Sequence, residues 1–151
     1  MSIFYVVLIV VILLVLWIVG SYNSLIKFRN RAQEAWGDID VQLKRRYDLI
    51  PNLIETVKAY TKHERDTLEA VTKARTAAMS AKSPEAKGQA ENMITEALKS
   101  IFAVAEAYPE LKANENFKAL QDELVDTEDK IQASRRFYNG SVRDLNIKVK
   151  V

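Results

Sequence analysis

Hydrophobic positions follow two different patterns along the chain. Residues 3–19 are all apolar, and the first charged side chain is that of Lys27. The rest of the chain repeats apolar residues every three or four positions, which is the spacing of one face of an α-helix. Only four glycines and three prolines occur, and strand-like alternation of apolar and polar residues is absent. The sequence therefore predicts an all-α protein whose N-terminal helix is unusually apolar.

The apolar run is long enough to cross a membrane. A hydrocarbon core of ~30 Å needs about 20 apolar residues in a helix, and a helix pairs its own backbone polar groups there. A cleaved signal peptide would carry a basic N-terminal region and a small-residue cleavage site, which the segments flanking this run lack. We expect an uncleaved, single-pass anchor over residues 1–22. A cleaved signal peptide and a buried core helix are the alternatives.

Basic residues flank the run on one side only. Lys27, Arg29 and Arg31 follow it closely, and none precedes it. Basic residues near a span tend to stay in the cytoplasm, and aromatic residues such as Trp17 and Tyr22 favour the membrane interface. We therefore expect a protein of the cell membrane with its N-terminus outside and residues 23–151 in the cytoplasm.

Turn signals divide residues 23–151, taken as one domain, into four helices. Pro51 predicts a turn, since proline suits the first turn of a helix but not its interior. Ser83 followed by Pro84 is typical of a helix start, and Pro109 with Asn114 marks the next boundary. The predicted helices span residues 23–47, 51–81, 84–108 and 115–150.

Each of these helices carries an apolar stripe. The most regular stripes pass through Ile101 and Val104 in the third helix and through Leu124 and Ile131 in the fourth, and we expect these four side chains to be buried. Short connections make neighbouring helices antiparallel, and heptad-like spacing favours coiled-coil-like packing. The expected architecture is an up-down-up-down antiparallel four-helix bundle, into which the single transmembrane helix continues.

Composition and motifs argue against several functions. Lys and Arg number 22 and Asp and Glu 20, so the net charge of +2 lacks the positive field that nucleic acid requires. Cysteine is absent, which excludes disulfides, thiolate metal sites and a catalytic thiol. The only histidine, His63, is followed by Glu64 but by no second histidine, so the zincin motif is incomplete. We expect no cofactor, no nucleic acid and no small-molecule substrate.

Four glutamates fall at similar heights in the expected bundle: Glu34, Glu64, Glu96 and Glu128. Only Glu64 and Glu128 are placed so that they can face inward. Solvated or salt-bridged glutamates, a structural polar layer and a metal site are the three interpretations. The paired Glu-x-x-His motifs of di-iron bundles are absent, so we expect no metal.

Two sets of polar residues are candidates for contacts. A charged surface near the end of the first predicted helix comprises Asp38, Asp40, Lys44, Arg45 and Arg46. Its basic members could bind an acidic partner or simply be solvated at a helix end. The second set would join the first and last helices through tyrosine–asparagine hydrogen bonds, or bind peptide or lipid: Tyr22, Asn23, Tyr138 and Asn139. Arg135 is expected in a groove of the bundle, paired with Glu34 or Glu69 to offset its desolvation.

Several blocks of this sequence resemble the LemA family. They are YNSL at residues 22–25, the long block at residues 34–60, VAEAYPELKANENF at residues 104–117 and RRFYN at residues 135–139. The resemblance covers almost the whole chain. It implies an N-terminal membrane anchor, a helical bundle and a bacterial or archaeal origin, and it implies no particular reaction.

We therefore expect a LemA-like, membrane-anchored scaffold or assembly protein of the cell envelope without catalytic activity. Its expected partners are the lipid bilayer and either further copies of itself, in a homo-oligomer, or other membrane proteins. The alternative is a metal-binding or enzymatic four-helix-bundle protein. A pore of associated spans is disfavoured, because residues 3–19 offer no polar side chain to line water.

Overall fold

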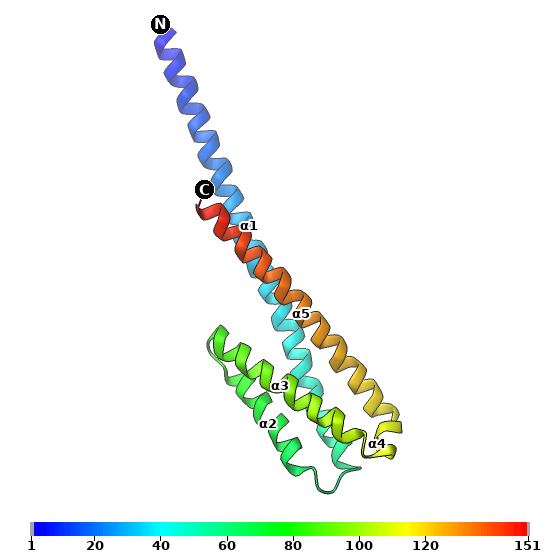
Figure 1. Ribbon diagram of the computed structural model, residues 1–151. Helices are drawn as coiled ribbons and strands as arrows, with labels where there is room; N and C mark the ends of the chain where they lie inside the picture. The colour runs from blue at the N-terminus through cyan, green and yellow to red at the C-terminus, as the bar shows by residue number, and fades with distance from the viewer. Residues whose placement is uncertain (1, 151) are drawn as a thin grey trace. The chain divides into compact units, whose positions relative to one another are not determined.

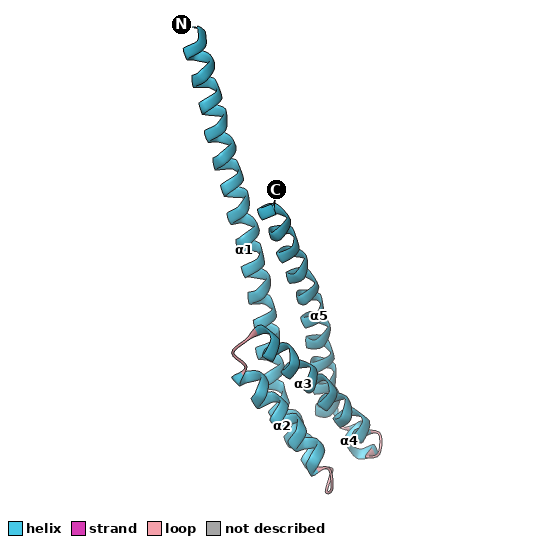
Figure 2. Ribbon diagram, turned by 60° about the vertical axis from the view of Figure 1, so that its left-hand side comes forward, coloured by secondary structure: helices cyan, strands magenta, loops and turns pink. Residues whose placement is uncertain are grey.

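The computed structural model describes residues 2–150, and within them the regular structure is entirely helical (Figures 1 and 2). In chain order the helices are α1 (Ser2–Lys58), α2 (Arg65–Ser80), α3 (Pro84–Ala105), α4 (Pro109–Ala113) and α5 (Glu115–Lys150). The prediction of an all-α protein is confirmed.

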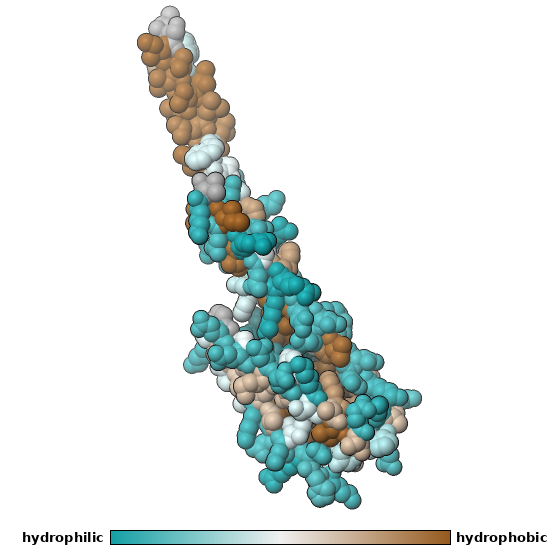
Figure 3. Space-filling model, in the orientation of Figure 1, coloured by the Kyte–Doolittle hydropathy of each residue, from teal (hydrophilic) through white to brown (hydrophobic). Residues whose placement is uncertain are grey.

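The helix α1 is continuous over 57 residues. Residues 3–19, at its N-terminal end, leave their apolar side chains exposed, and they form the brown part of the surface in Figure 3. By length and composition this helix can cross a membrane. The expected anchor is thus present as a candidate membrane span, and the same helix continues into the folded part of the chain.

The turn predicted at Pro51 is wrong, because α1 passes through this proline and ends at Lys58. Proline has no backbone N–H, so it cannot bond the carbonyl of Tyr47 four residues earlier. The side chain of Arg75 in α2 replaces that bond, since its Nε donates to the Tyr47 carbonyl oxygen at 2.8 Å. The segment predicted as one helix, residues 51–81, is therefore divided between α1 and α2.

The later helix boundaries lie close to those predicted. Before α3, the Ser83 hydroxyl accepts a hydrogen bond from the Ala86 N–H at 3.1 Å, as expected of an N-cap. Before α5, the Asn114 side chain accepts from the Phe117 N–H at 2.9 Å. The helix α5 has the predicted bounds, whereas α3 ends at Ala105 and the short α4 lies in the predicted connection.

The chain divides into two compact units. We call Val41–Ile131 the central unit, and Met1–Asp40 together with Gln132–Val151 the terminal unit. Both α1 and α5 contribute to both units. The four-helix bundle predicted for residues 23–151 stays a prediction, because the helices are described within each unit separately.

The core of the central unit contains one apolar stripe from each of its helices. The largest apolar side chains with almost no exposed surface are Leu43, Ile50, Leu53, Val57, Val71, Ile94, Ile101, Leu111, Phe117, Leu124 and Ile131. The rings of Phe102 and Phe117 meet edge to face, with 6.3 Å between their centroids. The predicted burial of Ile101, Leu124 and Ile131 is confirmed, while Val104 is only half-buried.

In the terminal unit, α1 and α5 pack through aromatic and small side chains. Trp36 and Tyr138 lie with their ring centroids 5.2 Å apart, and the guanidinium of Arg31 lies 5.4 Å from the centre of the Phe137 ring. Ser141 of α5 is also buried.

Candidate functional site

The central unit contains a cluster of buried polar side chains that we call the polar core cluster. Its members are Arg46 and Tyr47 of α1, Glu91 and Thr95 of α3, and Glu128 of α5. The side chains of Arg46 and Glu91 expose only 2% and 1% of their surface, and that of Glu128 exposes 26%. Charged residues are almost never buried this deeply unless they are paired, so the geometry of the pairing decides what the cluster can do.

Arg46 lies between the two carboxylates. Its Nη1 is 2.8 Å from Oε2 of Glu128 and 3.4 Å from Oε2 of Glu91. Its Nη2 donates to the hydroxyl of Thr95 at 2.9 Å. One guanidinium therefore connects α1 to both α3 and α5 through charge-assisted contacts, which are stronger than neutral hydrogen bonds.

Neutral groups complete the cluster. The hydroxyl of Tyr47 donates to Oε1 of Glu91. The Thr95 hydroxyl oxygen lies 3.2 Å from Oε2 of Glu128 and 3.1 Å from the Glu91 carbonyl oxygen. Glu91 is thus held by both a cation and a phenol, which offsets much of the cost of removing a carboxylate from water.

The sequence places these residues by helical spacing. Arg46 is three residues after the buried Leu43 and four before the buried Ile50, so it occupies the inward face of α1. Glu91 likewise precedes the buried Ile94 by three residues. The signal was therefore present in the spacing, but the charges of Lys44, Arg45 and Arg46 made the segment resemble a solvated surface.

The cluster does not have the composition of a metal site. No group of three or more potential ligand side chains gathers within residues 2–150, and Arg46 already lies between the two carboxylates. Two buried polar atoms, Nε of Arg46 and Oε1 of Gln42, have no hydrogen-bond partner in the described part of the chain. The arrangement is suited to holding three helices together by ion pairing.

Of the four glutamates singled out in the sequence, two face inward and two face outward, as their spacing predicted. Glu128 points into the polar core cluster. Glu64 is half-buried and accepts from the Tyr108 hydroxyl at 3.3 Å. Partial burial of the phenol, together with this bond to Glu64, raises the pKa of Tyr108 above its usual value. Glu34 and Glu96 are exposed.

The predicted charged surface is only partly on the outside. The prediction that Arg46 is an outward-facing contact residue is wrong, because its side chain lies in the core. Lys44 and Asp38 are exposed, and Asp40 is half-buried. Arg45 is exposed and bridges two carboxylates of α5, that of Asp126 at 3.2 Å and that of Glu123 at 3.3 Å. The proposal that this surface binds a partner stays a prediction for the exposed residues.

Within residues 2–150, no hydrogen bond joins Tyr22 or Asn23 to Tyr138 or Asn139, so this prediction is wrong. Tyr22, Asn23 and Asn139 are exposed, and Tyr138 lies against Trp36 instead. The register of α5 along α1 explains the error. Tyr22 shares a groove with Lys148 and Val149, well beyond Tyr138 in the sequence.

Arg135, which was expected in a groove of the bundle, is half-buried. Its predicted carboxylate partners are wrong. Glu34 is exposed, and Glu69 pairs with Lys73 at 2.7 Å. No ion pair joins Arg135 to either glutamate among the described residues. Partial exposure lets water solvate the guanidinium, so a carboxylate is not required.

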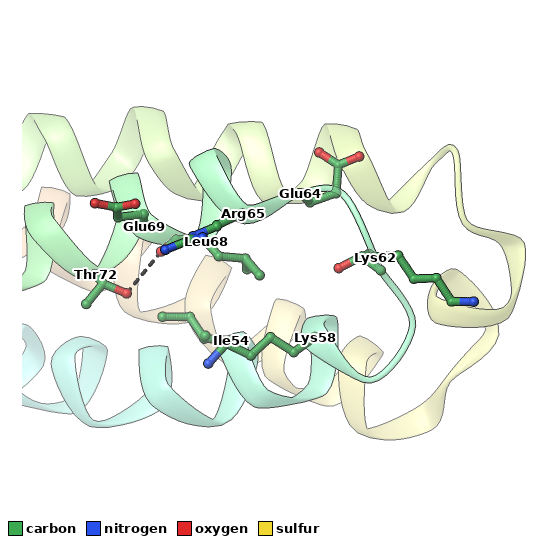
Figure 4. A pocket seen from close by; sticks show the side chains of 9 residues that line it. Ile54, Lys58, Lys62, Glu64, Arg65, Leu68, Glu69 and Thr72 are labelled. Carbon is green, nitrogen blue, oxygen red and sulfur yellow. Dashed lines mark hydrogen bonds between the residues drawn. The ribbon is translucent and has the colours of Figure 1, made fainter.

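A groove of about 470 Å³ lies between the end of α1 and the start of α2 (Figure 4). Ile54 and Leu68 form its apolar base, and long charged side chains surround them, including Lys58, Lys62 and Arg65. The Thr72 hydroxyl donates to the Leu68 carbonyl at 3.0 Å, so this polar group is already bonded within α2. The groove therefore presents solvated charges around a small apolar patch.

Comparison with known proteins identifies the family of this chain. The model of the LemA family matches residues 35–151 of this chain. The protein LemA of Metamycoplasma hominis is 31% identical over 136 residues, a match that covers 87% of this chain and 60% of that relative. The chain thus spans about 60% of the length of the relative. Because the family model covers most of the chain, including all residues of the polar core cluster, this protein belongs to the LemA family.

Proposed function

We propose that this protein is a membrane-anchored, non-enzymatic scaffold or assembly protein of the cell envelope. The observation that carries the proposal is the continuity of α1. One helix begins in the exposed apolar run and ends among buried core residues such as Leu53 and Val57. A single helix thus carries both the candidate anchor and core residues without a connecting loop, which suits a scaffold.

The polar core cluster supports this function by specifying how helices pack. Its ion pairs link α1, α3 and α5 from the inside, and buried ion pairs of this kind can select one arrangement of helices over others. Its carboxylates contact Arg46 and Tyr47. The cluster therefore acts as an internal support in this proposal, and partner binding is left to the outer surface.

The outer surface of the terminal unit offers a place for association. A groove of about 690 Å³ runs along α1 and α5, with Trp36, Tyr138, Val142 and Leu145 among its lining residues. Phe137 nearby exposes 47% of its surface. Aromatic residues are enriched in protein–protein contacts, so we propose that a second copy of this chain covers this groove. Exposed charges of the predicted contact surface, such as Lys44 and Asp38, would add selectivity.

The membrane orientation is part of the proposal. Basic side chains follow the span on one side only, which favours the N-terminus outside and residues 23–151 in the cytoplasm. A reporter that is active only outside the cytoplasm, fused after residue 151, should stay silent. An active reporter would reverse the orientation and leave the anchor in place.

Site-specific photocross-linking tests the association. The chain has no cysteine, so Gln33→Cys creates a single attachment point for a photoreactive label beside the groove. Illumination in native membranes should give an adduct with twice the mass of the chain. The matched control, Asp122→Cys, lies on the exposed face of α5 in the central unit and should not give it. Equal yields at both positions, or no adduct at Gln33, would contradict the proposed self-association.

A further inference from the structure

The last turns of α5 lie beside the end of the candidate span, within the terminal unit. Lys148 and Val149 share a groove with Trp17 and Tyr22 of α1. Trp17 and Tyr22 expose 68% and 62% of their surface, at the point where the apolar run ends. Aromatic side chains in that position favour the headgroup level of a bilayer. A bilayer that holds Trp17 and Tyr22 at its headgroup level would hold the neighbouring turns of α5 there too.

The exposed side chains of these turns combine apolar and basic groups. Ile147 exposes 55% and Val149 65% of its surface. Lys148 and Lys150 are exposed beside them. At a membrane surface, the stems of lysine side chains lie along lipid while their ammonium groups reach the headgroups.

The charge of this region is positive. On α1, Lys27 follows Val19, and the helical rise of ~1.5 Å per residue places it about 12 Å further along the helix. The one acidic side chain in the last turns of α5, Asp144, lies 3.9 Å from the guanidinium of Arg143. The charges left near the end of the span are thus those of Lys27, Lys148 and Lys150, all within about a Debye length of the headgroups.

We propose that residues 146–150 of α5 form a second membrane contact, which binds anionic lipid headgroups beside the span. Ile147 and Val149 enter the headgroup region, and Lys148 and Lys150 pair with lipid phosphates. The charge complementarity and the continuity with the span select lipid as the occupant. The contact would hold α5 and α1 at the same membrane surface and so fix the tilt of the helix pair. This inference rests on the membrane anchoring proposed above.

Spin labelling of single-cysteine variants tests the contact in the full chain. The protein would be reconstituted into phosphatidylcholine vesicles with and without phosphatidylglycerol, and each nitroxide would be probed with oxygen and a water-soluble nickel chelate. Asn146→Cys reports on the proposed contact without changing the side chains that make it, those of Ile147, Lys148, Val149 and Lys150. Leu13→Cys reports on the span, and Asp122→Cys is the exposed reference on α5.

We expect the nitroxide at residue 146 to be shielded from nickel in anionic vesicles. Its accessibility to the nickel chelate should lie between those of the nitroxides at residues 13 and 122. Each lysine at an anionic surface contributes about fivefold to binding, so K148Q/K150Q should weaken docking about 25-fold and restore nickel access. The control K62Q/K118Q changes the net charge equally, at exposed sites of the central unit, and should have no effect. Docking that survives K148Q/K150Q, or that is unaffected by phosphatidylglycerol, would overturn the role of anionic lipid.

The labels also separate this proposal from the anchor. A shielded residue 13 with residue 146 as accessible as residue 122 would overturn the second contact and leave the anchor standing. If residue 13 is also accessible to nickel, the anchor fails and the second contact fails with it.

Discussion

Replacing Arg46 by methionine should strongly destabilise the central unit. The substitution keeps the length and apolar stem of the side chain but removes the guanidinium that lies 2.8 Å from Glu128 and 3.4 Å from Glu91. Glu91 exposes only 1% of its side chain, so water cannot replace the lost cation. Removing one partner of a buried ion pair costs about 3–5 kcal/mol.

The neighbouring arginine provides a matched control. Arg45 also bridges two carboxylates, at 3.2 and 3.3 Å, but its side chain exposes 42% of its surface. Exposed ion pairs contribute about 0–1 kcal/mol, because water and salt screen them. R45M therefore removes the same charge, one residue away, with little expected effect on the free energy of unfolding.

Thermal unfolding of the full chain in mild detergent, followed by circular dichroism, measures the difference. At roughly 3 °C per kcal/mol for a chain of this size, R46M should lower the melting temperature by about 9–15 °C and R45M by about 3 °C or less. The double variant R46M/E91M should regain part of the loss, since neither charge is then left buried alone. If R46M melts no lower than R45M, the buried ion pair does not stabilise the protein and the assigned role of the polar core cluster is refuted.

Three further predictions address the helix at Pro51, the core and the surface charges. Arg75→Ala should cost about 1–3 kcal/mol, because it leaves the carbonyl released by Pro51 unpaired, and the cost should shrink in a Pro51→Ala background measured by denaturant titration. Leu124→Ala should cost about 2–5 kcal/mol in the same titration, since the side chain is almost fully buried and its loss leaves a cavity. The hydrogen bond from Lys130 holds the pKa of Asp126 below its usual value, so the stability that this carboxylate contributes is present above about pH 4 and is lost as the pH falls through its folded pKa. Asp126→Asn should therefore flatten the dependence of the melting temperature on pH below about pH 4.

Local signals predicted most of the helices. The Ser83 and Asn114 caps bond backbone N–H groups three residues onward, so the starts of α3 and α5 depend only on nearby residues. The continuity of α1 could not be predicted in this way. Whether a helix passes Pro51 depends on a donor for the Tyr47 carbonyl, and that donor, Arg75, comes from another helix.

The polar core cluster was partly visible in the sequence. The spacing of Glu128 placed it on the inward face of its helix, as the structure confirms. Arg46 was assigned to the surface because it ends a run of three basic residues, although its spacing from Leu43 and Ile50 is that of a core position. The charge of Arg46 predicted an exposed side chain, whereas its spacing predicted a buried one. It is buried because carboxylates of α3 and α5 pair with it, and the local sequence does not show these partners.

The mass of the full chain in mild detergent, measured by light scattering together with its metal content, tests the scaffold proposal most directly. We predict an oligomer, or a stable complex with another membrane protein, without stoichiometric metal. The Leu124→Ala variant serves as a control for loss of core stability. Its oligomeric mass should equal that of the unaltered chain if association occurs through the groove of the terminal unit. A strict monomer that carries one metal ion per chain would contradict the scaffold proposal and favour the metal-binding or enzymatic alternative.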